Sequence, residues 1–165
     1  MDNNGLSQGG SYTLNSGALA NGTTAGTIRI TAAIAFVIDG VFAAAKAITD
    51  NISIALTLPP TYGVATDGSF TGQAGGSTRL YGLYMNAAGA VSVLPGPIVN
   101  TAHLAAGQVA LQFPSSRRNL CFFGALRVAV NAGVTFVPGT TALNAAGVTA
   151  SYLNCATIPA EPLRA

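Results

Sequence analysis

The chain has 165 residues, of which 7 are Lys or Arg and 5 are Asp or Glu, so 7% of it is charged while 50% is hydrophobic. An average soluble domain is about 25% charged. This composition argues against a disordered chain, which would carry more charge and less Val, Ile and Leu, and against a nucleic-acid-binding protein, which would carry more Lys and Arg. An enzyme with a polar site would usually need more titratable groups. The surface of such a chain is poorly protected against association.

One domain is expected at this length, and it is long enough to bury a core without a disulfide or a metal. The first 27 residues hold no basic region followed by an apolar stretch, so no signal peptide is predicted and synthesis in a cytoplasm is expected. In that compartment Cys121 and Cys155 are expected to be buried free thiols, with a disulfide as the alternative. The long uncharged runs are broken by proline, glycine and asparagine, so no membrane span is predicted.

The N-terminal segment, residues 1–26, is rich in Asn, Gly, Ser and Thr and is predicted to be an extended arm, followed by a single β-domain over 27–165. It has two interpretations. One is a loose terminus. The other is an arm that becomes ordered on a neighbouring subunit, with its scattered apolar residues as anchors. Those anchors are Leu6, Tyr12, Leu14 and Leu19.

The first strands of the domain meet at a recognisable turn. Asp39-Gly40 separates two β-prone runs, 34–38 and 41–43. A type I′ turn needs positive φ at both central residues, so this dipeptide predicts a β-hairpin. The clearest half-buried strand is 52–58, where large apolar residues alternate with small or polar ones and two prolines follow.

Short strands and turns account for most of the remaining chain. Three phrases of the form Asn-Ala-(Ala)-Gly adjoin β-prone runs and are typical of hairpin connections. Aromatic residues on strands, Phe42 among them, are expected in the core. The predicted fold is all-β: an antiparallel, jelly-roll-like β-sandwich or barrel that follows the extended arm. Further strands are predicted at 27–30, 78–85, 91–94, 108–113, 120–130, 134–137 and 148–153, with an edge strand at 98–99 and a helical turn at 102–106.

Two loops carry candidate contact residues. Tyr62 and Phe70 lie in a Gly-rich surface loop, where exposed aromatic side chains suggest a contact surface. Arg117 and Arg118 follow a Pro-Ser-Ser turn, as part of either a solvated loop or a charged anchor for an acidic partner surface. Two phosphate contacts are fewer than the roughly six to ten of real DNA-binding proteins, so no nucleic-acid partner is predicted.

The motifs that usually carry catalysis are missing or out of context. His103 is the only histidine, and a metal site needs three or four ligands. The pattern Gly-x-Ser-x-Gly at 5–9 lies in the polar arm with no strand before it, whereas a nucleophile elbow needs a strand and a helix around the serine. We therefore expect no enzyme activity, no metal and no cofactor.

Three stretches of the chain resemble a known family. They are 16–30, the hairpin 36–46 and 136–150; the first and last are rich in Ala, Gly and Thr, and the hairpin contains a run of three Ala. They are similar to small virion proteins of tailed bacteriophages, of the capsid decoration or cement type. The resemblance implies a β-rich subunit, often trimeric, that docks on capsid-protein junctions after head expansion and braces the shell.

The function expected from this resemblance is that of a structural virion protein on the capsid surface, made in the host bacterial cytoplasm. Its expected partners are the major capsid protein and itself, as a homotrimer, with no nucleic acid and no membrane. The alternatives are a head-fibre, tail or baseplate component, or a receptor- or carbohydrate-binding module. The candidate partner-binding residues are Leu6, Tyr12, Leu14, Leu19, Tyr62, Phe70, Arg117 and Arg118.

Overall fold

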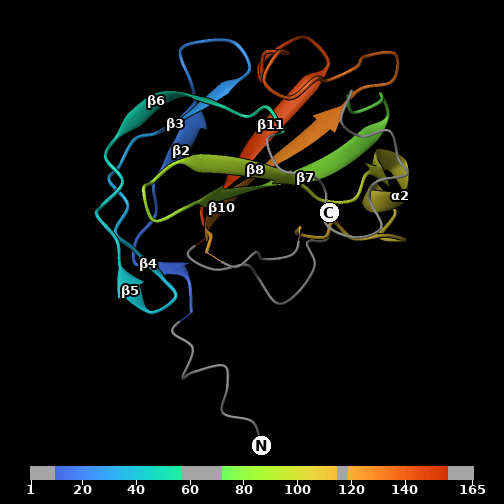
Figure 1. Ribbon diagram of the computed structural model, residues 1–165. Helices are drawn as coiled ribbons and strands as arrows, with labels where there is room; N and C mark the ends of the chain where they lie inside the picture. The colour runs from blue at the N-terminus through green and yellow to red at the C-terminus, as the bar shows by residue number, and fades with distance from the viewer. Residues whose placement is uncertain (1–9, 57–71, 115–118, 156–165) are drawn as a thin grey trace, which may run out of the picture.

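The computed structural model describes residues 10–56, 72–114 and 119–155. These residues form three antiparallel sheets and one short helix (Figure 1). The prediction of an all-β, antiparallel fold is confirmed. Of its two architectures the sandwich agrees with the structure, because none of the three sheets within the described residues closes into a barrel.

The largest sheet crosses the centre of the molecule in the order β11-β10-β7-β8, and a short strand, β9, also pairs with β7. Every residue of β7 is buried, because the sheet is covered on both faces. A strand of this kind has an apolar side chain on each face rather than a polar side that faces water. The bounds are β7 Ser77–Met85, β8 Val91–Pro95, β9 Val99–Asn100, β10 Cys121–Val130 and β11 Val148–Leu153.

Two smaller sheets help to form the main core together with one face of the central sheet. Their orders are β1-β4-β5 and β2-β3-β6. Ile28, Ile30, Phe36 and Ile54 from the smaller sheets and their flanks meet Leu126 of β10 in this core. The bounds are β1 Tyr12–Thr13, β2 Leu19–Asn21, β3 Thr27–Ile30, β4 Phe36–Ile38, β5 Val41–Phe42 and β6 Thr49–Ser53.

The other face of the central sheet is covered by helix α2, Thr101–Ala105, and the chain that follows it. Asn100 caps this helix, since its side-chain oxygen accepts from the backbone amides of Ala102 at 2.8 Å and His103 at 3.3 Å. Leu104 points from the helix into a second core. The buried residues of this core are Leu80, Tyr84, Leu94, Leu104, Leu111, Phe122 and Ala125.

The predicted hairpin is confirmed. Asp39 and Gly40 have φ of 48° and 81°, and β4 and β5 pair on either side of them. The helical turn at 102–106 corresponds to α2, and the strands at 78–85, 91–94, 120–130 and 148–153 correspond to β7, β8, β10 and β11.

Three predicted strands differ from the structure. The strand at 52–58 is placed too late, because β6 is Thr49–Ser53 and the chain has left the sheet by Ile54; residues 57 and 58 lie outside the described residues. The run predicted as a strand at 108–113 has only a single bridge residue, Leu111. Val109, Leu111 and Phe113 alternate in sequence because they pack on the second core. The run 134–137 contributes only an isolated bridge, from Phe136 to Gln73.

The predicted arm is partly built into the sheets. Residues 12–13 and 19–21 form β1 and β2, which pair with β4 and β3. The arm predicted over 1–26 therefore contains two short paired strands, and its residues 1–9 lie outside the described residues. Figure 1 shows β4 and β5 at lower left, β2, β3 and β6 above them, and α2 on the opposite side of the molecule.

Candidate functional site

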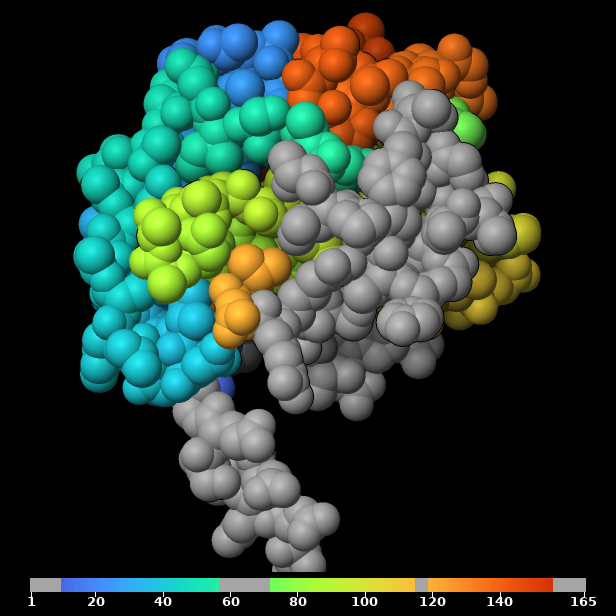
Figure 2. All heavy atoms as spheres, viewed as in Figure 1, coloured from blue at the N-terminus to red at the C-terminus, as the bar shows by residue number. Residues whose placement is uncertain are grey.

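The most unusual feature of the surface is the placement of its large apolar side chains. Within the part of the chain that the structure describes, five such side chains are exposed, and all five come from β1, β5 and the segments that follow them. Figure 2 shows the segment 41–48, in cyan, at the surface at lower left. The five and their exposed fractions are Tyr12 39%, Leu14 51%, Val41 69%, Phe42 75% and Ile48 67%.

Strand pairing places several of these side chains on one side of the β1-β4-β5 sheet. Tyr12 pairs with Val37, and Val37 pairs with Phe42, so the three form a row across the sheet. Residues directly opposite each other in antiparallel strands project to the same face. Leu14 joins them, because its amide donates to the carbonyl of Ala35 at 2.8 Å and so continues the same register. We call Tyr12, Leu14, Val37 and Phe42 the outer face.

The opposite side of the same sheet belongs to the main core. Phe36 is fully buried and Ile38 is 8% exposed, and both contribute to that core. Because side chains alternate along a strand, Val37 between them must project the other way. The outer face is therefore an apolar sheet surface on the side away from the main core. Val37 at its centre is only 2% exposed, whereas Tyr12, Leu14 and Phe42 around it are open to solvent.

The hairpin also leaves backbone groups open at its edge. Ile38 is opposite Val41, and Ala43 donates to the carbonyl of Phe36 at 3.1 Å. Phe42 lies between these two hydrogen-bonded positions, so its N–H and C=O point away from β4. No other described strand pairs with β5 on that side. We call the outer side of the segment 41–46 the β5 edge.

Few charges surround this region. Asp39 stands at the hairpin turn, where its backbone amide donates to the Ser11 hydroxyl oxygen at 3.1 Å and its carboxylate accepts from the same hydroxyl at 3.3 Å. Lys46 is half-buried, and its backbone exchanges two hydrogen bonds with Ile34, of 2.8 and 2.9 Å. The β5 edge thus has an acid at one end, a base at the other, and apolar residues between them.

The predicted contact residues have different placements. Tyr12 and Leu14 are exposed on the outer face, as a contact role requires. Leu19 is 7% exposed and packs in the chain's own main core, so it is not available as an anchor. The remaining candidates, Leu6, Tyr62, Phe70, Arg117 and Arg118, lie outside the described residues.

Phe42 does not lie where its sequence pattern predicts. It was expected in the core as an aromatic residue on a strand, and it is 75% exposed. The correct placement follows from the turn. A two-residue turn at 39–40 sets residue 37 opposite 42, so that burial of Phe36 and Ile38 forces Phe42 outwards.

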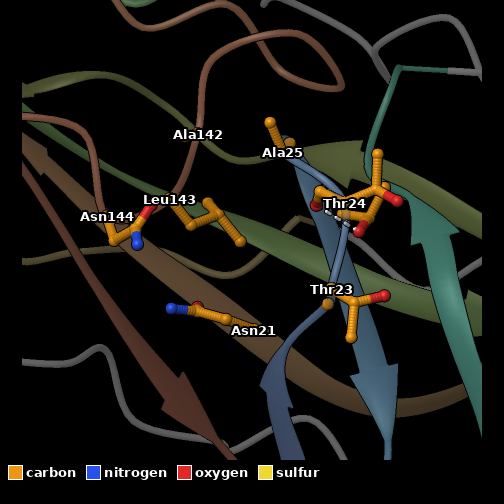
Figure 3. A pocket seen from close by; sticks show the side chains of 10 residues that line it. Asn21, Thr23, Thr24, Ala25, Ala142, Leu143 and Asn144 are labelled. Atoms are coloured by element: carbon orange, nitrogen blue, oxygen red, sulfur yellow. Dashed lines mark hydrogen bonds between the residues drawn. The ribbon is translucent and has the colours of Figure 1, made fainter.

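A pocket of about 270 Å³ lies at another part of the surface, where the β2–β3 turn meets the loop 142–144 (Figure 3). Its side chains carry amides and hydroxyls, and no charged or aromatic residue lines it. Gly26 allows the two loops to approach: its φ is 68°, and a Cβ there would lie 2.7 Å from the carbonyl carbon of Gly139. The lining residues are Asn21 to Thr27, Ala142, Leu143 and Asn144.

The wall of the pocket is fixed by a network at Asp50. The amide of Asn51 donates to Asp50 at 2.7 Å, and the amide and hydroxyl of Thr23 lie 3.2 and 3.0 Å from its carboxylate oxygens. These bonds, that of Asn51 foremost, hold the pKa of Asp50 below its ordinary value. Nearby, the hydroxyl of Tyr152 donates to the side-chain oxygen of Asn21. Asp50 is therefore occupied in holding the turn.

Groups that could perform chemistry are dispersed. In residues 10–56, 72–114 and 119–155 no three His, Cys, Asp or Glu side chains cluster closely enough to hold a metal ion. His103 is exposed on α2, and Cys121 and Cys155 are free thiols. Of the helices among the same residues, none has the length and apolar character needed to cross a membrane.

No protein-family model matches the chain, and no curated protein or solved structure matches it either.

Proposed function

We propose that this protein is a structural, non-catalytic subunit that docks on other polypeptides through its outer face. The observation that carries the proposal is the gathering of the exposed large apolar side chains on the β1-β4-β5 sheet and its flanks. Apolar patches of this kind, in a chain with 7% charged residues, are typical of surfaces that are covered in an assembly.

The burial of apolar area favours docking at the outer face. Covering an exposed phenyl ring such as that of Phe42 removes on the order of 150 Å² from water, worth about 4 kcal/mol at ~25 cal/mol per Å². Tyr12 and Leu14 add to this area on the same face. Few charged groups lose their hydration when the face is covered, so the opposing desolvation cost is small.

In its specific form, the proposal is that the chain decorates a bacteriophage capsid and braces the junctions between copies of the major capsid protein. The resemblance of its Ala-, Gly- and Thr-rich stretches to capsid decoration proteins supports this form. A repeated shell offers many identical sites, so modest contacts at each outer face add up to a durable coat. Head-fibre, tail or baseplate structures are alternative locations for the same kind of docking.

The test is occupancy on assembled shells. The protein is mixed with expanded shells of the major capsid protein encoded in the same gene cluster, and bound copies are counted after sedimentation. Phe42→Ser and Tyr12→Ser should each lower the apparent affinity at least tenfold, while Ile48→Ser, an equally exposed change outside the outer face, should not. An equal loss of shell affinity in all three variants, or no shell binding by the wild type, would contradict the proposal. Binding of the wild-type protein to purified tails and not to shells would support the alternative location.

A carbohydrate-binding role is the second candidate, favoured by the amide- and hydroxyl-lined pocket between Asn21 and Asn144. Sugar sites usually combine such polar groups with apolar or aromatic surfaces, and this lining has Leu143 but no aromatic ring. A glycan array tests it: binding that is lost in Asn144→Ala and kept in Phe42→Ser would favour the pocket over the outer face.

A further inference from the structure

We propose that the β5 edge binds a second copy of this chain, with the two edges paired antiparallel about a two-fold axis. The inference deepens the proposed function, because it names a partner for the docking region, and it rests on that function only for the role of the resulting pair. It joins the two β1-β4-β5 sheets into one continuous sheet, which doubles the outer face.

The first support is the open ladder. The N–H and C=O of Phe42 point away from β4. The regular ladder ends where Ala43 donates to Phe36, and the isolated bridge between Ile34 and Lys46 lies one residue out of that register. The segment 41–46 holds no proline: Val41 and Phe42 form the strand, 43–45 follow without regular pairing, and four of the six residues are exposed. Edges of this kind are templates for pairing with another strand unless they are blocked by charge or proline. The only charged residue within the edge is Lys46.

The second support is the fit of side-chain sizes in an antiparallel pair. Pairing centred on Ala43 sets each Phe42 opposite Ala44 of the other copy. It also sets each Val41 opposite Ala45 of the other copy. Each large side chain therefore meets a small one, and the exposed flank of Val41 is covered.

The third support is charge complementarity. Asp39 and Lys46 stand at opposite ends of the edge. An antiparallel pair centred on Ala43 brings Asp39 of each copy within one residue of Lys46 of the other, and it keeps the two lysines apart. A parallel arrangement would set like charges side by side, which disfavours it.

The expected homotrimer would require a different contact. A closed ring of three copies joins two different surfaces of each subunit, whereas the β5 edge is complementary to itself. The mass of the complex therefore separates the two arrangements.

Sedimentation velocity of the full chain from about 1 μM to 1 mM tests the pairing, with a dimer as the expected species. Lys46→Glu sets an acid against Asp39 of the other copy and should raise the dissociation constant about tenfold, as two exposed ion pairs turn repulsive. Asp39→Lys should have the same effect, and the double variant Asp39→Lys/Lys46→Glu should restore association. Circular dichroism melting confirms that each variant is folded.

Hydrogen exchange locates the contact. The amides of residues 41–46 should gain protection as the concentration rises, and Phe42→Pro, which removes the outward N–H, should abolish both protection and dimer. A monomer throughout the concentration range, a trimer, protection of another segment, or a double variant that stays dissociated would each overturn the pairing. If the protein is a monomer that binds shells, the pairing is wrong and the proposed function stands. If it is a dimer that binds no shells, the pairing stands and the proposed function is wrong.

Discussion

Two residues, Asp39 and Gly40, determine which side chains reach the outer face. Their positive φ values of 48° and 81° close a two-residue turn, and that turn sets Val37 opposite Phe42. A turn longer by one residue would shift the register and send Phe42 towards the core side. The exposure of Phe42 thus depends on the conformation of this turn dipeptide.

Gly40→Val should therefore destabilise the protein. A β-branched residue at a φ of 81° is strained by about 1–3 kcal/mol, and the free energy of unfolding in urea should fall by that amount. Gly40→Asn, which tolerates positive φ, is the matched control and should lose much less. An unchanged midpoint for the valine variant would contradict the turn geometry.

A buried thiol makes stability depend on alkaline pH. Burial raises the pKa of Cys121 from its ordinary 9.0 to about 11, and that of Tyr152 from 10.0 to about 12. Above pH 9 the unfolded chain loses the thiol proton while the folded chain keeps it, so ionisation favours unfolding. The contribution is complete below pH 9 and is lost as the pH rises towards 11.

The free energy of unfolding should accordingly be level near pH 8 and decline between pH 9 and 11. Cys121→Val removes the thiol at similar volume and should make the decline shallower over the same interval. Urea titrations at half-unit pH steps measure both. A wild type and a variant with parallel slopes would show that Cys121 does not ionise on unfolding.

At the scale of elements, the sequence predicted most of the central sheet and less of its surroundings. The runs that became β7 and β10 are long and apolar, and a strand buried on both faces needs only such a run. The alternation in 108–113 was misleading, because packing on the second core imposes the same spacing on an irregular segment. The β-propensity of a segment cannot tell a true strand from an irregular segment with the same apolar spacing unless the neighbouring strand is known.

The candidate site was predictable only in part. Tyr12 and Leu14 were identified from their apolar character in a polar segment, whereas Leu19 was indistinguishable from them and lies in the core. Phe42 required the pairing register. Arg79 was unforeseen altogether: it is fully buried, its Nε donates to the carbonyl of Gly96 at 2.6 Å, and its guanidinium carbon lies 5.7 Å from the centre of the Tyr81 ring.

Leu104 is the buried side chain through which helix α2 packs on the sheet. Leu104 is fully buried in the second core, while His103 beside it is exposed. Leu104→Ala should lower the free energy of unfolding by about 2–5 kcal/mol, since it removes buried methyl groups and leaves a cavity. His103→Ala should change it by less than about 0.5 kcal/mol. Similar losses for the two variants in urea unfolding would contradict the packing of the helix.

For the whole molecule, low charge and an apolar sheet surface act together. The two cores close on both faces of the central sheet, while Tyr12, Leu14 and Phe42 on the outer face of β1-β4-β5 remain exposed. In an isolated monomer these exposed apolar side chains stay in contact with water and add no stability. In an assembly that covers them, their burial would add to the binding free energy.

Cryo-electron microscopy of decorated shells tests this account most directly. The account predicts density for the chain on the capsid with Tyr12, Leu14 and Phe42 buried at the contact and α2 turned away from it. Shells that carry the chain with its outer face open to solvent, and with a different surface against the capsid protein, would contradict it.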